Sequence, residues 1–304
     1  MVVASRHRRR LAWALALVLA LFALPAVRAD AYVYWGNRDD HSIGRAELDG
    51  SGVTQQFLSL PGEPTGVGAM WGFALDDSHI FWSHGSATGG GIGRVGLDGS
   101  DLSTDFVTTS GFPMGVAVDD THLYWANGTN GVDPASGSIG RADRDGPAAD
   151  ATWVQHAAWT VFGVAVDASH VYWANGSGRQ TVGRANLDGT GADQSFVSGL
   201  DATTGVAVDD DYLYWSTGSA IGRAKLDGSD VDKEFISAPA YGIAVDGGHI
   251  YWAGGSFIGR AKLDGSDVEQ QWITGAARAH VVAVDDRVRT TATLTASRDH
   301  PIYS

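Results

Sequence analysis

Short apolar runs separated by polar turn residues recur along most of the chain. The clearest copy spans residues 242–272 and reads GIAVDGGHIYWAGGSFIGRAKLDGSDVEQQW. Each of its four apolar runs is too short for a helix and is bounded by Gly, Asp, Asn or Ser, which favours strands joined by tight turns. We name the expected strands A (242–246), B (250–253), C (257–262) and D (to about residue 273).

This unit occurs six times, and we number the copies repeat 1 to repeat 6 along the chain. An aromatic residue followed by Trp marks strand B: Tyr34-Trp35, Phe81-Trp82, Tyr124-Trp125, Tyr172-Trp173, Tyr214-Trp215 and Tyr251-Trp252. An apolar residue followed by Gly-Arg marks strand C, at Gly44, Gly93, Gly140, Gly183, Gly222 and Gly259. Six strand A segments end at Asp76, Asp119, Asp167, Asp209, Asp246 and Asp285. The first strand B therefore has no strand A before it, and one strand A follows the last strand D.

Repetition of a four-stranded unit at this period points to a ring. Units of roughly 40 residues that recur four to eight times are typical of a β-propeller, whose blades stand around a central channel. The sequence predicts an all-β fold, a six-bladed β-propeller of four-stranded blades over residues 30–286. We expect the C-terminal strand, residues 281–285, to complete blade 1 and close the ring.

The combination of GVAVD, YW and IGRAxLDGS resembles the YWTD repeat, also called the low-density lipoprotein receptor class B repeat. The resemblance covers residues 32–285 and implies a six-bladed propeller. The Asp of YWTD is replaced in all copies, by Asn37, His84, Asn127, Asn175, Thr217 and Gly254. The hydrogen bonds of that Asp are therefore not expected here. The modules that flank such propellers in receptors require Cys, which the chain lacks, so the resemblance implies the fold and not receptor function.

The N-terminal segment has the features of a secretory signal peptide. Four Arg residues between positions 6 and 10 precede an apolar run over 11–24, and small residues lead up to Ala29. We expect residues 1–29 to be removed and the mature protein to be secreted, extracellular or periplasmic. A membrane anchor, the alternative, needs about 20 apolar residues. Residues 287–304 lack the repeat marks and are expected to form a disordered tail or an edge strand.

Composition adds a strong acidic bias. The chain has 21 Lys and Arg residues against 35 Asp and Glu, and loss of the five Arg within 1–29 leaves 16 basic residues and a net charge of −19. Such a surface argues against nucleic acid and anionic membranes as partners. The absence of Cys means that stability comes from burial, which a repeat protein of this length can supply. We expect a monomer without a membrane span after cleavage.

Residues that recur in every repeat are interpreted as fold residues, because a ring poses the same packing problem in each blade. Burial of a strand B Trp contributes on the order of 4 to 6 kcal/mol before entropy is subtracted. The strand C arginines are expected to pair with carboxylates of strand A or of hairpin turns, with anion binding as the alternative. Four histidines after strand A are expected to pack on turns: His79, His122, His170 and His249.

Loop lengths differ between the two ends of the predicted blades. The A–B and C–D turns keep one length in every comparable copy. The step from the strand B Trp to the strand C apolar residue varies from 6 to 14 residues, and the step from strand D to strand A varies from 7 to 15. The fixed face is rich in Asp, which turn chemistry explains. We predict no cofactor, with Ca²⁺ on this face as the alternative.

The residue before each strand A is expected at the channel mouth on the variable face. These residues are Trp71, Met114, Phe162, Thr204, Tyr241 and His280. Large aromatic and thioether side chains are typical of recognition surfaces, and a simple plug of the mouth is the alternative. We add His84, Asn127 and Asn175 from the YWTD position to this candidate binding surface.

The variable face predicts a secreted binding module for a protein, peptide or saccharide partner. The alternative is a lactonase-like or lyase-like enzyme with a metal-assisted site at the channel mouth. No carboxylate occupies the six mouth positions, and no catalytic residue is predicted. The remaining loop candidates are His84, His156, Glu63, Asp133 and Asp201, and a site that combines His84 with His280 stays open.

Overall fold

The computed structural model describes residues 31–60, 70–86, 89–109, 112–128, 137–146, 148–157, 161–176 and 179–285. These residues form β-strands in repeated antiparallel sheets. Within these ranges, no helical segment has the length and apolar character of a membrane span. The predicted signal peptide (1–29) and tail (287–304) lie outside the described residues.

Repeats 2 to 5 each form one four-stranded sheet whose strands A to D are consecutive in the chain. Repeat 2 contains β4 (Phe73–Leu75), β5 (His79–Ser86), β6 (Gly89–Gly96) and β7 (Ser103–Thr109). Repeat 3 contains β8 (Phe112–Val118), β9 (His122–Gly128), β10 (Gly137–Asp143) and β11 (Ala149–Ala157). Repeat 4 contains β12 (Val161–Val166), β13 (His170–Asn175), β14 (Thr181–Asn186) and β15 (Asp193–Val197). Repeat 5 contains β16 (Gly205–Val208), β17 (Tyr212–Ser216), β18 (Ala220–Lys225) and β19 (Asp232–Ser237).

Repeats 6 and 1 join in one seven-stranded sheet. Its order is β20 (Ile243–Val245), β21 (His249–Ala253), β22 (Gly255–Lys262), β23 (Glu269–Val284), β1 (Tyr32–Asn37), β2 (Ser42–Glu47) and β3 (Thr54–Ser59). The first part of β23 pairs with β22, and residues 281–284 pair with β1. β23 therefore supplies strand D of repeat 6 and strand A of repeat 1. Arg278, at φ 53°, lies between the two parts.

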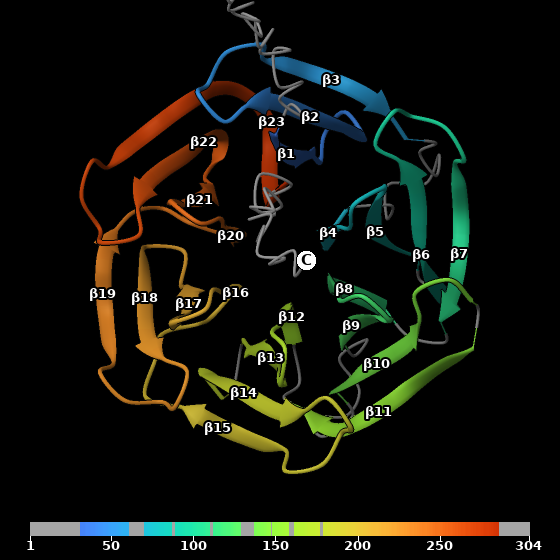
Figure 1. Ribbon diagram of the computed structural model, residues 1–304, viewed down its shortest axis with the longest axis vertical. Helices are drawn as coiled ribbons and strands as arrows, with labels where there is room; N and C mark the ends of the chain where they lie inside the picture. Colours follow the sequence, from blue (N-terminus) through green and yellow to red (C-terminus); the bar gives the residue numbers. More distant parts are fainter. Residues whose placement is uncertain are drawn as a thin grey trace, which may run out of the picture.

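The sheets stand around a common axis, with strand A of each repeat innermost and strand D at the periphery (Figure 1). Each inner strand contacts the next in the order β4, β8, β12, β16, β20 and β23, and β23 also contacts β4. This all-β arrangement is that of a β-propeller, as the sequence predicted.

The strand B tryptophans pack directly onto strand C. Trp125 is fully buried, as are four of its counterparts, and Trp82 is 4% exposed. Trp125 is paired in register with Gly140, and a Cβ atom built on the strand C glycine would lie 2.1 to 2.4 Å from the indole in all six repeats. The indole can lie flat only because the residue beneath it has no side chain. This contact explains why the YW and Ile-Gly-Arg marks recur together.

The hydrophobic core lies between neighbouring sheets, because the aromatic residue and the Trp of strand B point to opposite faces. Tyr172 shares a buried cluster with Trp215 of the next repeat. Tyr251 of repeat 6 likewise shares a cluster with Trp35 of repeat 1. Repeat 6 thus packs on repeat 1 as the other neighbours pack on one another.

The strand C arginines make contacts that differ from the predicted ones. The guanidinium carbon of Arg184 lies 3.8 Å from the ring centroid of Phe196 in its own repeat. Arg184 Nη1 also donates a hydrogen bond to Leu226 O of the next repeat at 3.0 Å. The same donation recurs at Arg141, Arg223 and Arg260. Ring faces and backbone carbonyls of the hairpins take the place of the turn carboxylates that the sequence analysis expected.

Candidate binding site at the channel mouth

One end of the central channel opens beside the N-terminal ends of the inner strands. Four residues expected at the mouth, Trp71, Phe162, Thr204 and His280, line a cavity of about 60 Å³ at this end. Such a space holds on the order of four water molecules. Typical sites for drug-sized ligands occupy about 300 to 1,000 Å³. The cavity that the described residues form here is therefore smaller than a typical small-molecule site.

Glycines narrow this end of the channel, and the sequence analysis did not single them out. A Cβ atom on Gly72 would lie 2.0 Å from Met114 O, and one on Gly115 would lie 2.3 Å from Phe162 O. The inner strands can approach this closely only because a glycine follows the mouth residue in five repeats, at Gly72, Gly115, Gly163, Gly205 and Gly242. Their regular position after the mouth residue was the sequence signal that could have identified these glycines.

Trp71 forms one side of the mouth, together with an arginine from another repeat. The guanidinium carbon of Arg38, which follows β1, lies 3.8 Å from the centroid of the Trp71 ring. A cation over the face of Trp is attracted by the negative face of the ring. Trp71 also meets Phe112 edge to face, with ring centroids 6.3 Å apart. The indole Nε1 of Trp71 is buried and has no hydrogen-bond partner among the described residues.

Tyr241 and His280, which precede the inner strands of repeats 6 and 1, form a stacked pair at the mouth. Their ring centroids are 4.5 Å apart at an interplanar angle of 5°, and Tyr241 is 39% exposed. The backbone carbonyl of Tyr241 accepts hydrogen bonds from Thr204 Oγ1 and Ser216 Oγ, which fixes its position. Burial, followed by the charges of Arg38 and Arg278, lowers the pKa of His280 to about 4. The imidazole is therefore neutral at pH 7.

A second arginine, Arg278, lies beside the mouth. Arg278 Nη1 pairs with Asp39 Oδ1 at 3.0 Å. Burial, followed by the charge of Arg278, lowers the pKa of Arg38, while the charge of Asp39 opposes this shift. Two arginines and one carboxylate therefore act on the neutral His280, and positive charge is in excess at this point of an acidic protein.

The structure corrects the positions of two residues that were assigned to the mouth. Asn127 is 6% exposed and Asn175 is fully buried. Asn127 Nδ2 donates to Ala151 O at 2.6 Å, and Asn175 Nδ2 donates to Gln194 O at 3.0 Å. These amides connect strand B with strand D inside their own sheets. They are unavailable to a ligand, and their assignment to the binding surface is wrong.

His84 and Met114 are also placed differently from the other mouth candidates. The Nε2 atom of His84 lies 2.7 Å from Thr104 O on β7, so this ring contacts strand D of its own sheet. Met114 is 6% exposed and packs in a buried cluster with Trp173. The mouth is therefore formed by Trp71, Phe162, Thr204, Tyr241 and His280.

The loop candidates for an enzyme site are far apart in the fold or lie outside the described residues. Asp201 is exposed, and His156 belongs to the peripheral strand β11. Glu63 and Asp133 lie outside the described residues. Among the residues that the structure describes, no group of three or more His, Asp or Glu side chains is placed to hold a metal ion.

The opposite end of the channel is acidic, and its carboxylates serve the turns. A cavity of about 180 Å³ is lined by Asp167, Asp209, Asp210 and Asp246 together with inner-strand residues. In repeat 3, Asp119 Oδ1 accepts the backbone N–H groups of Thr121 and His122 at 2.7 Å each. Asp119 Oδ2 accepts the O–H of Tyr124 at 2.8 Å, and the same bond recurs in repeats 4 to 6. The ring of His122 packs on Tyr124, as predicted for a histidine on a turn.

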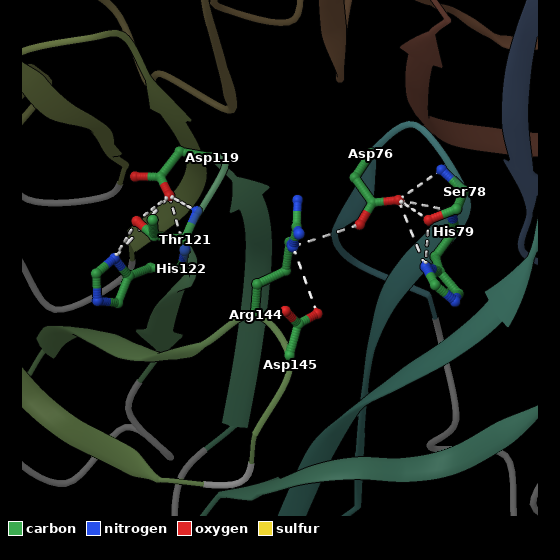
Figure 2. Close-up of polar contacts among 8 residues, drawn as sticks. All are labelled: Asp76, Ser78, His79, Asp119, Thr121, His122, Arg144 and Asp145. Atoms are coloured by element: carbon green, nitrogen blue, oxygen red, sulfur yellow. Dashed lines mark hydrogen bonds and ion pairs between the residues drawn. The ribbon is translucent and has the colours of Figure 1, made fainter.

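Repeat 2 departs from this pattern (Figure 2). Its strand B carries Phe81 in place of Tyr, so no phenol is available for Asp76. Arg144 of repeat 3 stands where the other repeats have Leu, and its Nε lies 4.0 Å from Asp76 Oδ2 and 3.5 Å from Asp145 Oδ1. A cation from the neighbouring sheet thus takes the place of the missing hydroxyl. The signal in the sequence was that Phe81 and Arg144 stand where the equivalent positions of the other repeats have Tyr and Leu.

Comparison with known proteins bears on the fold. No family model matches the chain. A chain in the crystal structure of a nidogen/laminin complex has a TM-score of 0.69, with 16% identity, over 84% of this chain and 98% of that chain. The fold is that of a YWTD-like β-propeller. This confirms the fold that the repeats predicted.

Two further likenesses bear on the same fold. A gluconolactonase from Xanthomonas campestris has a TM-score of 0.51 and 16% identity, over 73% of this chain and 83% of that chain. Protein cueball of Drosophila erecta is 34% identical over 104 residues, which are 33% of this chain. The match spans 16% of the length of that relative.

Proposed function

We propose that the protein is a binding module that recognises a protein, peptide or saccharide partner through the variable-loop face of its propeller. The observation that carries the proposal is the mouth itself, where Tyr241 is exposed and stacked on His280 above a cavity of only about 60 Å³. A ligand must therefore contact the surface of the mouth. Aromatic residues and Arg are the side chains that protein interfaces favour.

Two observations support an extracellular partner. Residues 1–29 have the composition of a signal peptide. One structural neighbour was solved in a complex of nidogen with laminin. We propose that the protein is exported, with cleavage after Ala29, and that it meets its partner outside the cytoplasm as a monomer. N-terminal sequencing of exported protein and light scattering test these points, and an N-terminus within residues 1–29 would contradict the cleavage.

We also infer that the propeller has six blades and is closed by strand pairing between the two ends of the chain. The six sequence repeats, the pairing of residues 281–284 with β1 and the contact of β23 with β4 support this closure.

Affinity measurements on two sets of variants test the binding proposal. Trp71→Ala, Phe162→Ala and Tyr241→Ala remove aromatic rings from the mouth, and we expect a loss of about 2 kcal/mol or more at any hot spot. The matched controls are Asp98→Asn, Asp188→Asn and Asp227→Asn on the opposite face, where each carboxylate serves its own turn. The partner is captured from the medium of the exporting cell and then used purified. Losses confined to the Asp variants would place the functional face at the other end.

The alternative function is a metal-assisted propeller enzyme, and the likeness to a gluconolactonase favours testing it. The assay is hydrolysis of gluconolactone by purified protein with added Ca²⁺, Mg²⁺ or Zn²⁺, together with the metal content of the protein. Metal-dependent turnover that is abolished by His280→Ala would support the enzyme and contradict a purely binding role.

A further inference from the structure

The mouth concentrates positive charge in a protein that is otherwise strongly acidic. Arg38 and Arg278 belong to segments about 240 positions apart, and backbone contacts bring them together. Ala277 N donates to Asn37 Oδ1 at 3.0 Å, and Asp39 N donates to Ala277 O at 3.3 Å. The chain carries 21 basic residues against 35 acidic ones, so two neighbouring arginines are unusual for its surface.

Local carboxylates do not balance these two charges. Asp39 is engaged by Arg278 at 3.0 Å, and Asp40, the next residue, accepts a hydrogen bond from Gln56 Nε2 at 3.3 Å. Within the described ranges, Arg38 forms no ion pair within 4.0 Å and instead lies over the Trp71 ring at 3.8 Å. Burial, followed by the charge of Arg278, lowers the pKa of Arg38, and the second cause agrees with a surplus of positive charge. His280 adds none, because it is neutral at pH 7.

The position of Arg38 also fits it to a particular ligand group. Trp71 covers one face of the planar guanidinium and thereby holds its orientation. The N–H edges of a guanidinium stacked in this way remain able to bind a carboxylate through two parallel hydrogen bonds. The stacked rings of Tyr241 and His280 offer apolar surface beside the cation for the rest of the ligand.

We propose that the mouth binds an acidic peptide segment of the partner, with an Asp or Glu carboxylate held by Arg38 and supported by Arg278. This inference rests on the proposed binding function and names the chemistry of its partner. A peptide fits better than a buried small molecule because the cavity has a volume of only about 60 Å³ and the aromatic contacts lie at its rim.

Selection from a displayed random peptide library, with the purified protein as bait, tests the inference. We expect the selected peptides to be enriched in Asp and Glu, and their affinity to fall tenfold or more when the critical Asp or Glu is changed to Asn or Gln. Arg38→Gln should weaken binding by a similar factor, and Arg278→Gln by less. Arg38→Lys keeps the charge and loses the planar fork, so it should retain part of the affinity. Lys225→Gln, at the end of β18 on the fixed face, removes the same charge and is the control. This change should leave affinity unchanged.

The outcomes separate the two proposals. Peptides that lose affinity with Tyr241→Ala but show no acidic bias and tolerate both Arg changes would overturn the carboxylate assignment and leave the binding face intact. Peptides that are insensitive to Tyr241→Ala would contradict the proposed function itself. Much stronger binding of acidic peptides to a chain that ends at Asp285 would identify residues 287–304 as the occupant and overturn the proposal. Equal thermal stability of the variants ensures that affinity is compared between folded proteins.

Discussion

The contact between a strand B tryptophan and the strand C glycine beside it determines the packing at the residue scale. A Cβ atom on Gly183 would lie 2.2 Å from the Trp173 ring, so Gly183→Ala must displace the indole. Overpacking of this kind costs about 1 to 3 kcal/mol of unfolding free energy. Gly248→Ala is the control, since its nearest neighbour would be 3.7 Å away. Urea denaturation that shows equal stability for both variants would contradict this account of the repeat.

Removal of the ring itself should cost more. Trp125 is fully buried, and Trp125→Ala leaves a cavity between repeats 2 and 3, where Trp125 shares a cluster with Phe81. We expect a loss of about 3 to 5 kcal/mol in the free energy of unfolding, as for other large-to-small changes in cores. A loss below about 1 kcal/mol, within the range of surface substitutions, would contradict the assigned packing.

His280 should make stability depend on pH. Its pKa is lowered to about 4, first by burial and then by Arg38 and Arg278, with Asp39 acting in the opposite sense. A histidine in the unfolded chain takes up its proton near pH 6.5. Between these values the unfolded state binds more protons, so the stabilisation present above pH 6.5 is lost as the pH falls towards 4. His280→Gln should flatten this part of the curve of unfolding free energy against pH, and an unchanged slope would show that His280 is not its source.

At the scale of strands and turns, Arg144 replaces a Tyr hydroxyl as the partner of Asp76, and the energy of this replacement can be measured. Arg144 lies 4.0 Å from Asp76, where the other repeats have a Tyr hydroxyl and a Leu. Arg144→Leu should destabilise the protein in the presence of Phe81 and should be tolerated better together with Phe81→Tyr. We expect a coupling energy of about 0.5 kcal/mol or more between the two sites in a double-mutant cycle. Additive effects would mean that the two substitutions are unrelated.

The strands and turns were predictable from the sequence because each is specified locally and six times. The Asp-Gly hairpins and the alternation around Tyr-Trp needed no long-range information. The same period of two could have corrected one error, since Trp125 and Asn127 lie on the same face of β9 and Trp125 Nε1 donates to Asn127 Oδ1 at 2.9 Å. That spacing places the Asn between the sheets and not at the mouth.

The mouth was only partly predictable, because its charged residues have no counterpart in the other repeats. Trp71, Phe162 and His280 were found by comparison of equivalent positions. Arg38 and Arg278 were missed, since one follows β1 and the other lies within β23. They become neighbours only because β1 pairs with β23. A repeat pattern does not show which residues this pairing brings together.

For the whole molecule, the proposed closure depends on the pairing of β23 with β1. A chain that ends at Ala279 loses the buried residues 281–283 and the partly buried Val284, and it exposes the edge of β1. We expect aggregation and a clearly lower melting temperature, because an unpaired β1 edge can pair with other chains. A chain that ends at Asp285 is the control and should behave as the full chain does. An unchanged, monomeric protein ending at Ala279 would refute closure by this strand.

The direction of this pairing also determines how the ring responds to force. Val33 pairs with Val284 in antiparallel register, and Asp285 N donates to Tyr32 O at 2.9 Å, so the first and last described strands have these ends side by side. A pull that separates the ends loads the hydrogen bonds between β1 and β23 one after another, as in the opening of a zipper, and not all at once as in shear. When force is applied between the two ends of the chain, the pairing of β1 with β23 should open at low force, while the sheets of repeats 2 to 5 remain folded.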